Sequence, residues 1–263
     1  MTLTVLFDLD DTLLNTNSKE FLPAYFNGLG QALSHLSSRE TIINQIRFAV
    51  EKMVENQDPS RVLKDVFSEN FYPPLGTTEE DCQAFIEQYY AEEFPKLQAL
   101  VGSKPEASDL VHWCKTQKIR LAIATNPLFP ETATRQRITW AGLEPEDFHF
   151  FSTYNNFHFT KPNLSYYAEA IGRLGWPEGP ILMVGDDLAL DLLPVEQIGL
   201  KTFWVNPRVG DAKRPHGKLS GVRVLLSRLQ DSNKESELSS DPEVLLAVLR
   251  STPAVVNTWL ETI

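Results

Sequence analysis

Near the start of the chain stand the residues Leu3-Thr4-Val5-Leu6-Phe7-Asp8-Leu9-Asp10-Asp11-Thr12-Leu13-Leu14. A β-prone, mostly apolar run leads directly into three crowded carboxylates, which predicts a buried strand that carries acids at its end. Because alternate residues of a strand point the same way, we expect Asp8 and Asp10 to share a face and Asp11 to leave it. The other polar motifs of the chain are interpreted relative to this strand end.

The three acids need a compensating partner. Like charges so close together repel and raise one another's pKa unless a cation or other donors compensate, so the cluster favours a metal site. The alternative interpretation is an ordinary turn after a strand, because aspartate is a common turn residue. The remaining motifs have to decide between these two interpretations.

Length, composition and charge set the class of protein. With 263 residues, 42% of them hydrophobic, the chain is able to bury the core of one large domain or of two smaller ones. A balance of 24 basic against 35 acidic residues gives a net charge of −11, which argues against binding to a nucleic-acid polymer or to an anionic membrane. An anionic small-molecule substrate would therefore need a local cation.

Cysteine usage and the N-terminal sequence predict a cytoplasmic location. Cys82 and Cys114 lie far apart without the spacing of a metal site, so we expect buried free thiols in a reducing compartment. The N-terminus lacks the basic and apolar regions of a signal peptide, and no apolar run reaches the length of a membrane span.

The stretch from residue 15 to residue 97 has the pattern of a helical insert. Apolar residues recur there at helical spacing, as in Phe21-Leu22-Tyr25-Phe26-Leu29, and no convincing strand interrupts them. Ser37-Ser38 and Thr77-Thr78 offer N-caps. We therefore predict about four helices, separated from the next part of the chain by a turn at Val101-Gly102-Ser103-Lys104-Pro105.

Beyond this turn, strands and helices alternate. The predicted strands are Arg120–Ala124, His149–Ser152, Ile181–Val184 and Lys201–Val205, and the predicted helices are Glu106–Gln117, Glu131–Ala141 and Ser165–Leu174. Such alternation is typical of an α/β fold with a doubly wound parallel sheet, in which ligands bind at the carboxyl ends of the strands. We expect a core of residues 1–14 and 98–230, the helical insert at 15–97, and a polar linker with a C-terminal helical extension at 231–263.

The polar residues at the ends of the predicted strands suit phosphoryl transfer. A carboxylate is able to attack phosphorus, which makes Asp8 the candidate nucleophile. Asp10 is the candidate general acid and base, which protonates the leaving oxygen and then takes a proton from water. Oxygen ligands from Asp8, from Asp186 and from the main chain near Asp10 predict a Mg²⁺ site, with Asp187 as an additional candidate.

Three of these motifs have plain structural alternatives. Thr125-Asn126-Pro127 is a common helix start. Lys161 before a proline is more often a solvated loop residue, and Asp186-Asp187 after a glycine is more often a turn. Their order and spacing nevertheless place all of them at one edge of one sheet, so together they favour a phosphate and metal site.

Over roughly residues 3–230 the chain resembles the haloacid dehalogenase superfamily of hydrolases. The motifs that carry the resemblance are Phe7-Asp8-Leu9-Asp10-Asp11-Thr12-Leu13, Ile123-Ala124-Thr125-Asn126, Lys161-Pro162 and Val184-Gly185-Asp186-Asp187-Leu188-Ala189-Leu190-Asp191. The resemblance implies a Rossmann-like core and, between the first two motifs, an all-helical cap that closes over the site and selects the substrate.

The resemblance also implies a role for each motif residue. The implied catalytic residues are Asp8, Asp10, Thr125 and Lys161, and the phosphate-binding residues are Thr125, Asn126 and Lys161. The implied metal ligands are Asp8, Asp10 and Asp186, with Asp187 and Asp191 in support, the latter orienting Lys161 or the metal shell. The cap residues expected to face the substrate are Asn15, Asn17, Tyr25 and Arg47.

We therefore predict a Mg²⁺-dependent phosphatase that hydrolyses a small phosphorylated metabolite through an aspartyl-phosphate. Asp10 argues for attack on phosphorus, because dehalogenases of this superfamily attack carbon and have no use for an acid there. A phosphomutase uses the same four motifs and stays open as the alternative. A phosphorylation-operated signalling module would carry its acceptor aspartate on a later strand than its acid pair. A non-catalytic binding protein would not need the full set of catalytic groups.

Overall fold

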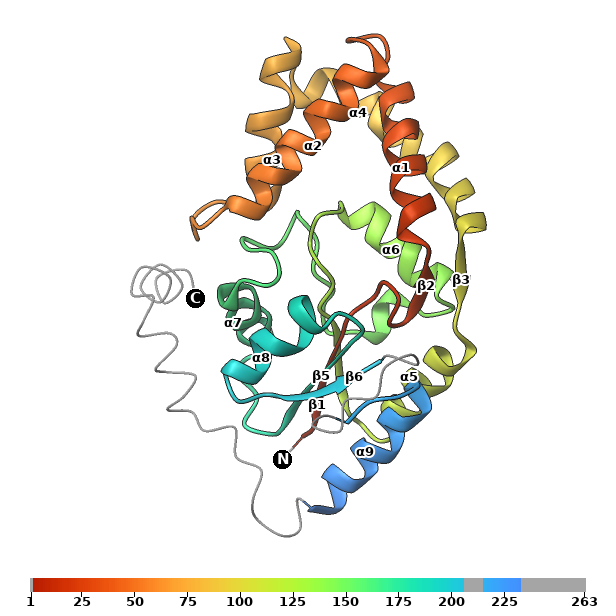
Figure 1. The fold of residues 1–263 in the computed structure, drawn as a ribbon, viewed down its shortest axis with the longest axis vertical. Helices are drawn as coiled ribbons and strands as arrows, with labels where there is room; N and C mark the ends of the chain where they lie inside the picture. Colours follow the sequence, from red (N-terminus) through yellow and green to blue (C-terminus); the bar gives the residue numbers. More distant parts are fainter. Residues whose placement is uncertain (1, 206–214, 233–263) are drawn as a thin grey trace.

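A parallel sheet lies at the centre of the fold (Figure 1). Its four strands are, in spatial order, β4 (Arg120–Ile123), β1 (Thr4–Phe7), β5 (Ile181–Gly185) and β6 (Lys201–Trp204). The computed structural model describes residues 2–205 and 215–232. β1 has a parallel neighbour on each side, and all of its residues are buried. The α/β fold with a parallel sheet, predicted from the sequence, is confirmed.

Helices account for most of the remaining described residues. In chain order they are α1 (Ser18–Ala32), α2 (Arg39–Glu55), α3 (Leu63–Phe71), α4 (Glu79–Gln88), α5 (Pro105–Thr116), α6 (Glu131–Trp140), α7 (Leu164–Arg173), α8 (Leu193–Gln197) and α9 (Leu219–Ser232). Short 3₁₀ or π turns lie at Pro73–Leu75, Tyr89–Glu93, Phe94–Leu100, Pro145–Asp147 and Leu188–Leu192. The predicted helices that correspond to α5, α6 and α7 are present, with bounds that differ by one residue.

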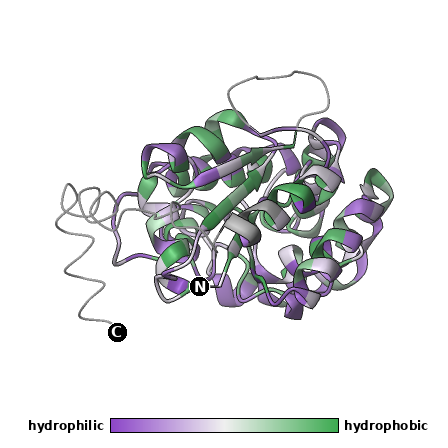
Figure 2. Cartoon of the chain, turned by 90° about the horizontal axis from the view of Figure 1, so that it is seen from below, coloured by the Kyte–Doolittle hydropathy of each residue, from purple (hydrophilic) through white to green (hydrophobic). Residues whose placement is uncertain are grey.

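Alternate residues of β1 pack in opposite directions, as two layers of helices require. Val5 and Phe7 belong to a core cluster with residues of α5 and α9, whereas Leu6 belongs to a second cluster with residues of α7 and α8. All three side chains are fully buried. Figure 2 shows hydrophobic strands among helices of mixed colour. Burial on both faces specifies the register, because a shift of one residue would exchange the two sets.

Two short strands that were not predicted connect the sheet to the helical segments. β2 (Leu14–Thr16) pairs antiparallel with β3 (Val101–Ser103). The predictions of a stretch without strands from residue 15 and of a turn at 101–105 are therefore wrong at these positions. Strands so short, with a partner so distant in the sequence, leave no local periodicity. This ribbon holds both chain crossings between the core and residues 17–100, hereafter the helical insert.

Other parts of the sequence prediction differ in smaller ways. The strand expected at 149–152 forms only an isolated bridge between Phe151 and Ile123, at the edge of the sheet. α9 was not predicted, and it packs on α5. The polar linker expected from residue 231 begins inside α9, which runs to Ser232, and the rest of residues 231–263 lies outside the described residues.

Polar side chains begin two helices of the insert, as predicted. Ser38 accepts a hydrogen bond from the backbone N–H of Thr41 at the start of α2. Thr78 and Asp81 form a reciprocal capping box at the start of α4. Within the described residues, no helix combines the length and apolar character needed to span a bilayer.

The helical insert contacts the core a second time, on the side away from the β2–β3 ribbon (Figure 1). Here residues 56–64, hereafter the docking loop, lie against residues 154–158 of the core. The side-chain amide of Asn56 donates to the carbonyl of His158 at 2.8 Å. Two backbone hydrogen bonds of 2.8 Å reinforce this contact, from Leu63 to Phe157 and from Lys64 to Tyr154. The insert is thus tied to the core at two separate places.

Asn56→Ala is expected to loosen the docking loop without unfolding the sheet. The change leaves the His158 carbonyl without this donor, at a cost of about 1–3 kcal/mol for a buried group left unpaired. Hydrogen exchange followed by mass spectrometry should show faster exchange at the Leu63 and Lys64 amides, with β1 unchanged. Ser60→Ala, at an exposed position of the same loop, is the control. Identical exchange in both variants and the wild type would show that Asn56 does not hold the loop.

Candidate active site

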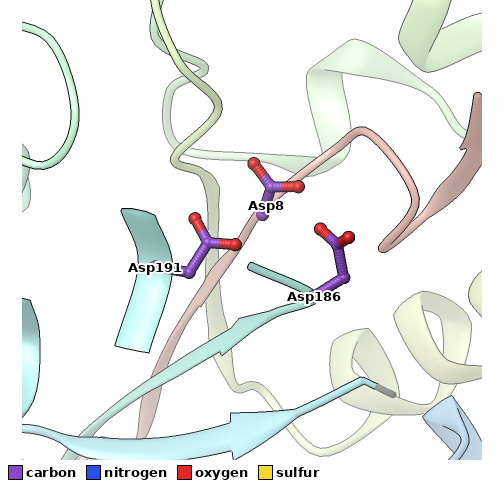
Figure 3. Close-up of side chains that lie close together, drawn as sticks. All are labelled: Asp8, Asp186 and Asp191. Atoms are coloured by element: carbon purple, nitrogen blue, oxygen red, sulfur yellow. The ribbon is translucent and has the colours of Figure 1, made fainter. Parts of the chain in front are cut away.

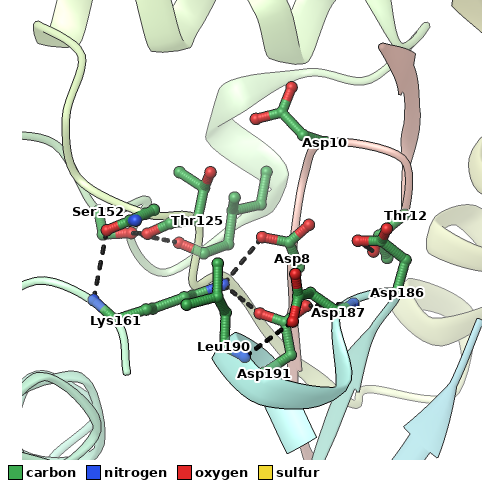
Figure 4. Close-up of polar contacts among 12 residues, drawn as sticks. Asp8, Asp10, Thr12, Thr125, Ser152, Lys161, Asp186, Asp187, Leu190 and Asp191 are labelled. Atoms are coloured by element: carbon green, nitrogen blue, oxygen red, sulfur yellow. Dashed lines mark hydrogen bonds and ion pairs between the residues drawn. The ribbon is translucent and has the colours of Figure 1, made fainter. Parts of the chain in front are cut away.

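Asp8 lies directly after β1, at the carboxyl edge of the sheet. Its N–H donates to the carbonyl of Val184 in β5 at 2.9 Å, which extends the strand ladder by one residue. Its side chain is 10% exposed, and its carboxylate accepts a hydrogen bond of 2.8 Å from the ammonium of Lys161 (Figure 4). The central strand thus holds a nearly buried carboxylate against a buried cation.

Lys161 joins two carboxylates that come from different elements. Its Nζ lies 2.8 Å from Oδ1 of Asp8 and 2.6 Å from Oδ1 of Asp191, and its side chain is 1% exposed. Burial alone would lower the pKa of the ammonium, but the charges of Asp191 and Asp8 raise it well above its ordinary value. Lys161 is therefore a fixed positive charge rather than a solvated loop residue.

Three carboxylates gather beside this ammonium: Asp8, Asp186 and Asp191 (Figure 3). One oxygen of each lies within 4.8 Å of the others. Lys161 compensates one of the three charges, which leaves two when all the acids are ionised. Burial, with Asp191 as the nearest unfavourable charge, raises the pKa of Asp186 to about 7. A set of hard oxygen donors with this surplus of negative charge fits a divalent cation such as Mg²⁺.

The turn after β5 directs two of these acids toward the cluster. A side chain at Gly185 would not fit, because its Cβ would lie 2.3 Å from Oδ2 of Asp191. The indole N–H of Trp204 donates to the carbonyl of Asp186 at 2.8 Å. The carboxylate of Asp187 instead accepts hydrogen bonds from the two backbone N–H groups that begin the next turn. Asp187 is therefore the N-cap residue of the helical turn Leu188–Leu192, and it lies outside the carboxylate cluster.

That Asp8 and Asp10 share a face stays a prediction. β1 ends at Phe7, and the chain then turns through Asp11, whose φ is +54°. The alternation of a strand no longer applies when the chain reaches Asp10, and Figure 4 shows its carboxylate well apart from that of Asp8. The carboxylate cluster contains Asp191 in place of the Asp10 side chain. A metal contact through the main chain near Asp10 stays a prediction.

Asp10 has a charged partner of its own, Arg137 of α6. Oδ1 of Asp10 accepts hydrogen bonds from the Arg137 guanidinium and, at 2.7 Å, from Oγ1 of Thr16. Loss of water around Asp10 raises the pKa of its carboxyl, but the charge of Arg137 and these hydrogen bonds outweigh that effect and lower it. Asp10 is therefore held in the ionised form. No sequence motif marked Arg137.

Thr125 and Asn126 follow β4 and border the same site. Thr125 is buried, and its carbonyl accepts hydrogen bonds from Oγ of Ser152 at 2.6 Å and from Oη of Tyr166 at 2.8 Å. The side chain of Asn126 accepts a hydrogen bond of 3.3 Å from the backbone N–H of Lys161. Ser152 and Tyr166 were not predicted, because they act through a backbone carbonyl and belong to no motif. The predicted phosphate contacts of Thr125, Asn126 and Lys161 stay predictions.

The insert residues expected to face the substrate have mixed positions. Tyr25 is buried, and its hydroxyl shares a hydrogen bond of 2.7 Å with that of Tyr90 inside the insert, so it is a packing residue. Asn15, Asn17 and Arg47 are exposed. Their contact with a substrate stays a prediction.

Known proteins share both the sequence pattern and the fold. A family model described as a haloacid dehalogenase-like hydrolase matches residues 2–199. The curated glyceraldehyde 3-phosphate phosphatase of Methanothermobacter thermautotrophicus is 25% identical over 229 residues, which are 84% of this chain and 92% of that protein.

Solved structures extend the likeness in fold. A 2-haloacid dehalogenase from Pseudomonas syringae pv. tomato has a TM-score of 0.56 at 21% identity, covering 87% of this chain and 99% of its own. A phosphatase of the same superfamily from Thermococcus onnurineus has a TM-score of 0.53 at 19% identity, covering 86% and 98%. These identities show a shared fold, and the family model spans most of the chain. This protein therefore belongs to the haloacid dehalogenase-like hydrolases.

Proposed function

We propose that this hydrolase is a Mg²⁺-dependent phosphatase that hydrolyses a small phosphate monoester through an aspartyl-phosphate on Asp8. The observation that carries the proposal is the position of Asp8, whose carboxylate lies 2.8 Å from the Lys161 ammonium at the centre of a three-carboxylate cluster. A nucleophilic carboxylate beside a fixed cation is what an incoming, negatively charged phosphoryl group requires.

In the proposed reaction an oxygen of Asp8 attacks phosphorus, and the bond from phosphorus to the ester oxygen breaks. Asp10, which is ionised in the free site, would take up a proton as the substrate binds and give it to that oxygen as it leaves. Water then attacks the phosphorus of the aspartyl-phosphate while ionised Asp10 takes a proton from it, and the bond to Asp8 breaks. Lys161 offers a positive charge to the phosphoryl oxygens in both steps.

The acid at position 10 favours phosphorus over carbon as the atom attacked. An ester oxygen that leaves phosphorus needs a proton, whereas a halide that leaves carbon does not. The ionised form of Asp10, which the neighbouring Arg137 stabilises, is the form that accepts a proton from water. The same acid-base assistance opposes a long-lived phosphorylated signal, which disfavours a receiver-type module.

Asp8, Asp186 and Asp191 are the residues that present carboxylate oxygens for a metal. We assign Mg²⁺ to Asp8 and Asp186, because both oxygens of Asp191 already accept hydrogen bonds, Oδ1 from Lys161 at 2.6 Å and Oδ2 from the backbone N–H of Asp187 at 3.1 Å, whereas Lys161 contacts only Oδ1 of Asp8. When bound, Mg²⁺ would neutralise charge on the phosphoryl oxygens and favour the ionised form of the nucleophile. Trp204 holds the main chain of Asp186 in place for this role.

The helical insert is proposed to act as the cap that selects a small phosphorylated metabolite. Its support is the position of the insert, which is tied to the core by the β2–β3 ribbon and by the docking loop. The curated relative is named for glyceraldehyde 3-phosphate, so small sugar phosphates are the first substrates to test. A cytoplasmic location is proposed as well, because Cys82 and Cys114 are both buried and unpaired, as predicted.

Asp8→Asn is expected to abolish phosphate release, by roughly 10⁴-fold or more in kcat, because the variant lacks the nucleophile. The measurement is phosphate release from a panel of monoesters, including glyceraldehyde 3-phosphate, phosphoglycolate and a nucleoside monophosphate, with Mg²⁺ or EDTA. Asp109→Asn, the same change on the exposed face of α5, should keep full activity. If folded wild-type protein with Mg²⁺ releases phosphate from no ester, the phosphatase proposal is wrong.

Asp186→Asn is expected to stabilise the metal-free protein and to remove its response to Mg²⁺. The pKa of Asp186 is raised from 3.8 to about 7 in the folded protein. The folded state therefore binds more protons than the unfolded chain, and the free energy of unfolding falls as pH rises through that interval. At pH 8 without metal, the variant should have the higher Tm, and the two proteins should converge near pH 4.

Mg²⁺ provides the second readout for this variant. At about 100 times its Kd, Mg²⁺ should stabilise the wild type by ~2.7 kcal/mol, about 5–10 °C in Tm. Asp186→Asn should show no such increase, while Asp109→Asn should respond as the wild type does. An unchanged Mg²⁺ shift in Asp186→Asn would remove Asp186 from the metal site.

A further inference from the structure

Arg137 is a buried cation that makes or breaks no bond of its own in the proposed reaction. It lies in α6 at 1% exposure and is among the largest fully buried side chains of the described residues. Its guanidinium donates to Oδ1 of Asp10, and the hydroxyl of Thr16 donates to the same oxygen at 2.7 Å. Burial of a charged side chain costs free energy, so the presence of an arginine at this buried position calls for a physical explanation.

Aromatic rings surround the guanidinium in place of water. Its central carbon lies 4.5 Å from the ring centroid of Phe129 and 5.4 Å from that of Phe21. Its Nε is buried and has no hydrogen-bond partner among the described residues. Burial of an ion pair is often no more stabilising than apolar side chains of similar volume, even where ring faces offset part of the desolvation. A methionine at position 137 would fill the same space without a buried charge. The presence of arginine therefore indicates that its charge acts on Asp10.

The hydrogen bonds distinguish the two oxygens of Asp10. Both hydrogen bonds that described side chains donate to this carboxylate reach Oδ1, one from Thr16 on β2 and one from Arg137 on α6. The side chain of Asp10 is 32% exposed, and no described side chain donates a hydrogen bond to its other oxygen. Two donors from different elements fix the plane of a carboxylate, because rotation would break both bonds. Oδ2 is left for proton exchange.

We propose that Arg137 is a positioning residue for Asp10: together with Thr16 it anchors Oδ1, so that Oδ2 exchanges protons with the leaving oxygen and with water. The inference rests on the proposed function, in which Asp10 is the general acid and base. Since Thr16 belongs to β2 and Phe21 to α1, the anchor also connects Asp10 to the place where the chain enters the helical insert.

The test uses the different needs of two leaving groups. An alkyl phosphate needs a proton on its leaving oxygen, whereas p-nitrophenyl phosphate releases a stable anion without one. In single-turnover experiments, Arg137→Met should cleave the best alkyl phosphate about 10²-fold more slowly than the wild type does. It should release p-nitrophenol from p-nitrophenyl phosphate at a rate within a few-fold of the wild-type rate. KM should change little, Arg137→Lys should recover part of the rate, and Arg137→Met should add no further loss to Asp10→Asn.

Thr16→Val keeps the inference testable if Arg137→Met does not fold, as judged by circular dichroism. It removes the other donor to Oδ1 with little change in volume, and it should cause a smaller loss with the same preference for the alkyl ester. Equal losses on both esters, or losses that add to those of Asp10→Asn, would make Arg137 merely structural and overturn the inference. A folded wild-type protein that cleaves neither ester with Mg²⁺ present would overturn the phosphatase proposal, whereas equal losses on both esters in an active protein overturn only this inference.

Discussion

The buried ammonium of Lys161 lies between the carboxylates of Asp8 and Asp191, and the rest of the site depends on this contact. The two acids come from the ends of β1 and of the turn after β5, so one cation joins segments that are distant in the sequence. Removing one partner of a buried ion pair typically costs about 3–5 kcal/mol, because the other charge is left uncompensated. The same contact therefore orders the loop before α7 and holds the two strand ends in register with each other.

The Lys161 ammonium compensates one of the three carboxylates in the cluster, so the site keeps a surplus of negative charge that is able to attract a cation. Asp186 adds a third carboxylate, and its burial, followed by the charge of Asp191, raises its pKa to about 7. Gly185 and Trp204 keep that acid in place although it disfavours the folded state. The folded state is thus less stable at this edge of the sheet than a neutral edge would allow, and the proposed Mg²⁺ would compensate these charges.

Asp8 and Asp10 are two residues apart but have opposite surroundings. Burial raises the pKa of Asp8 against the opposing charge of Lys161, whereas Arg137 lowers that of Asp10. The lowered pKa of Asp10 suits it to accept a proton from water, whereas ionisation of Asp8 in the proposed reaction would be favoured by the bound metal. The chain turns at Asp11, directly after Asp10, and the helical insert begins a few residues later, so the proposed proton-transfer group lies at the junction of core and insert.

The sequence by itself determined the class of fold and which polar residues gather at the carboxyl edge of the sheet, because both depend on local patterns. Buried strands are marked by apolar runs, helices by amphipathic periods, and polar residues after parallel strands necessarily meet at one edge of the sheet. Only the tertiary structure decided the pairing of β2 with β3, the direction of the Asp10 carboxylate and its contact with Arg137. Each of these depends on which distant segments pack together. An arginine on a helix has the same local sequence signal whether it faces water or a buried carboxylate.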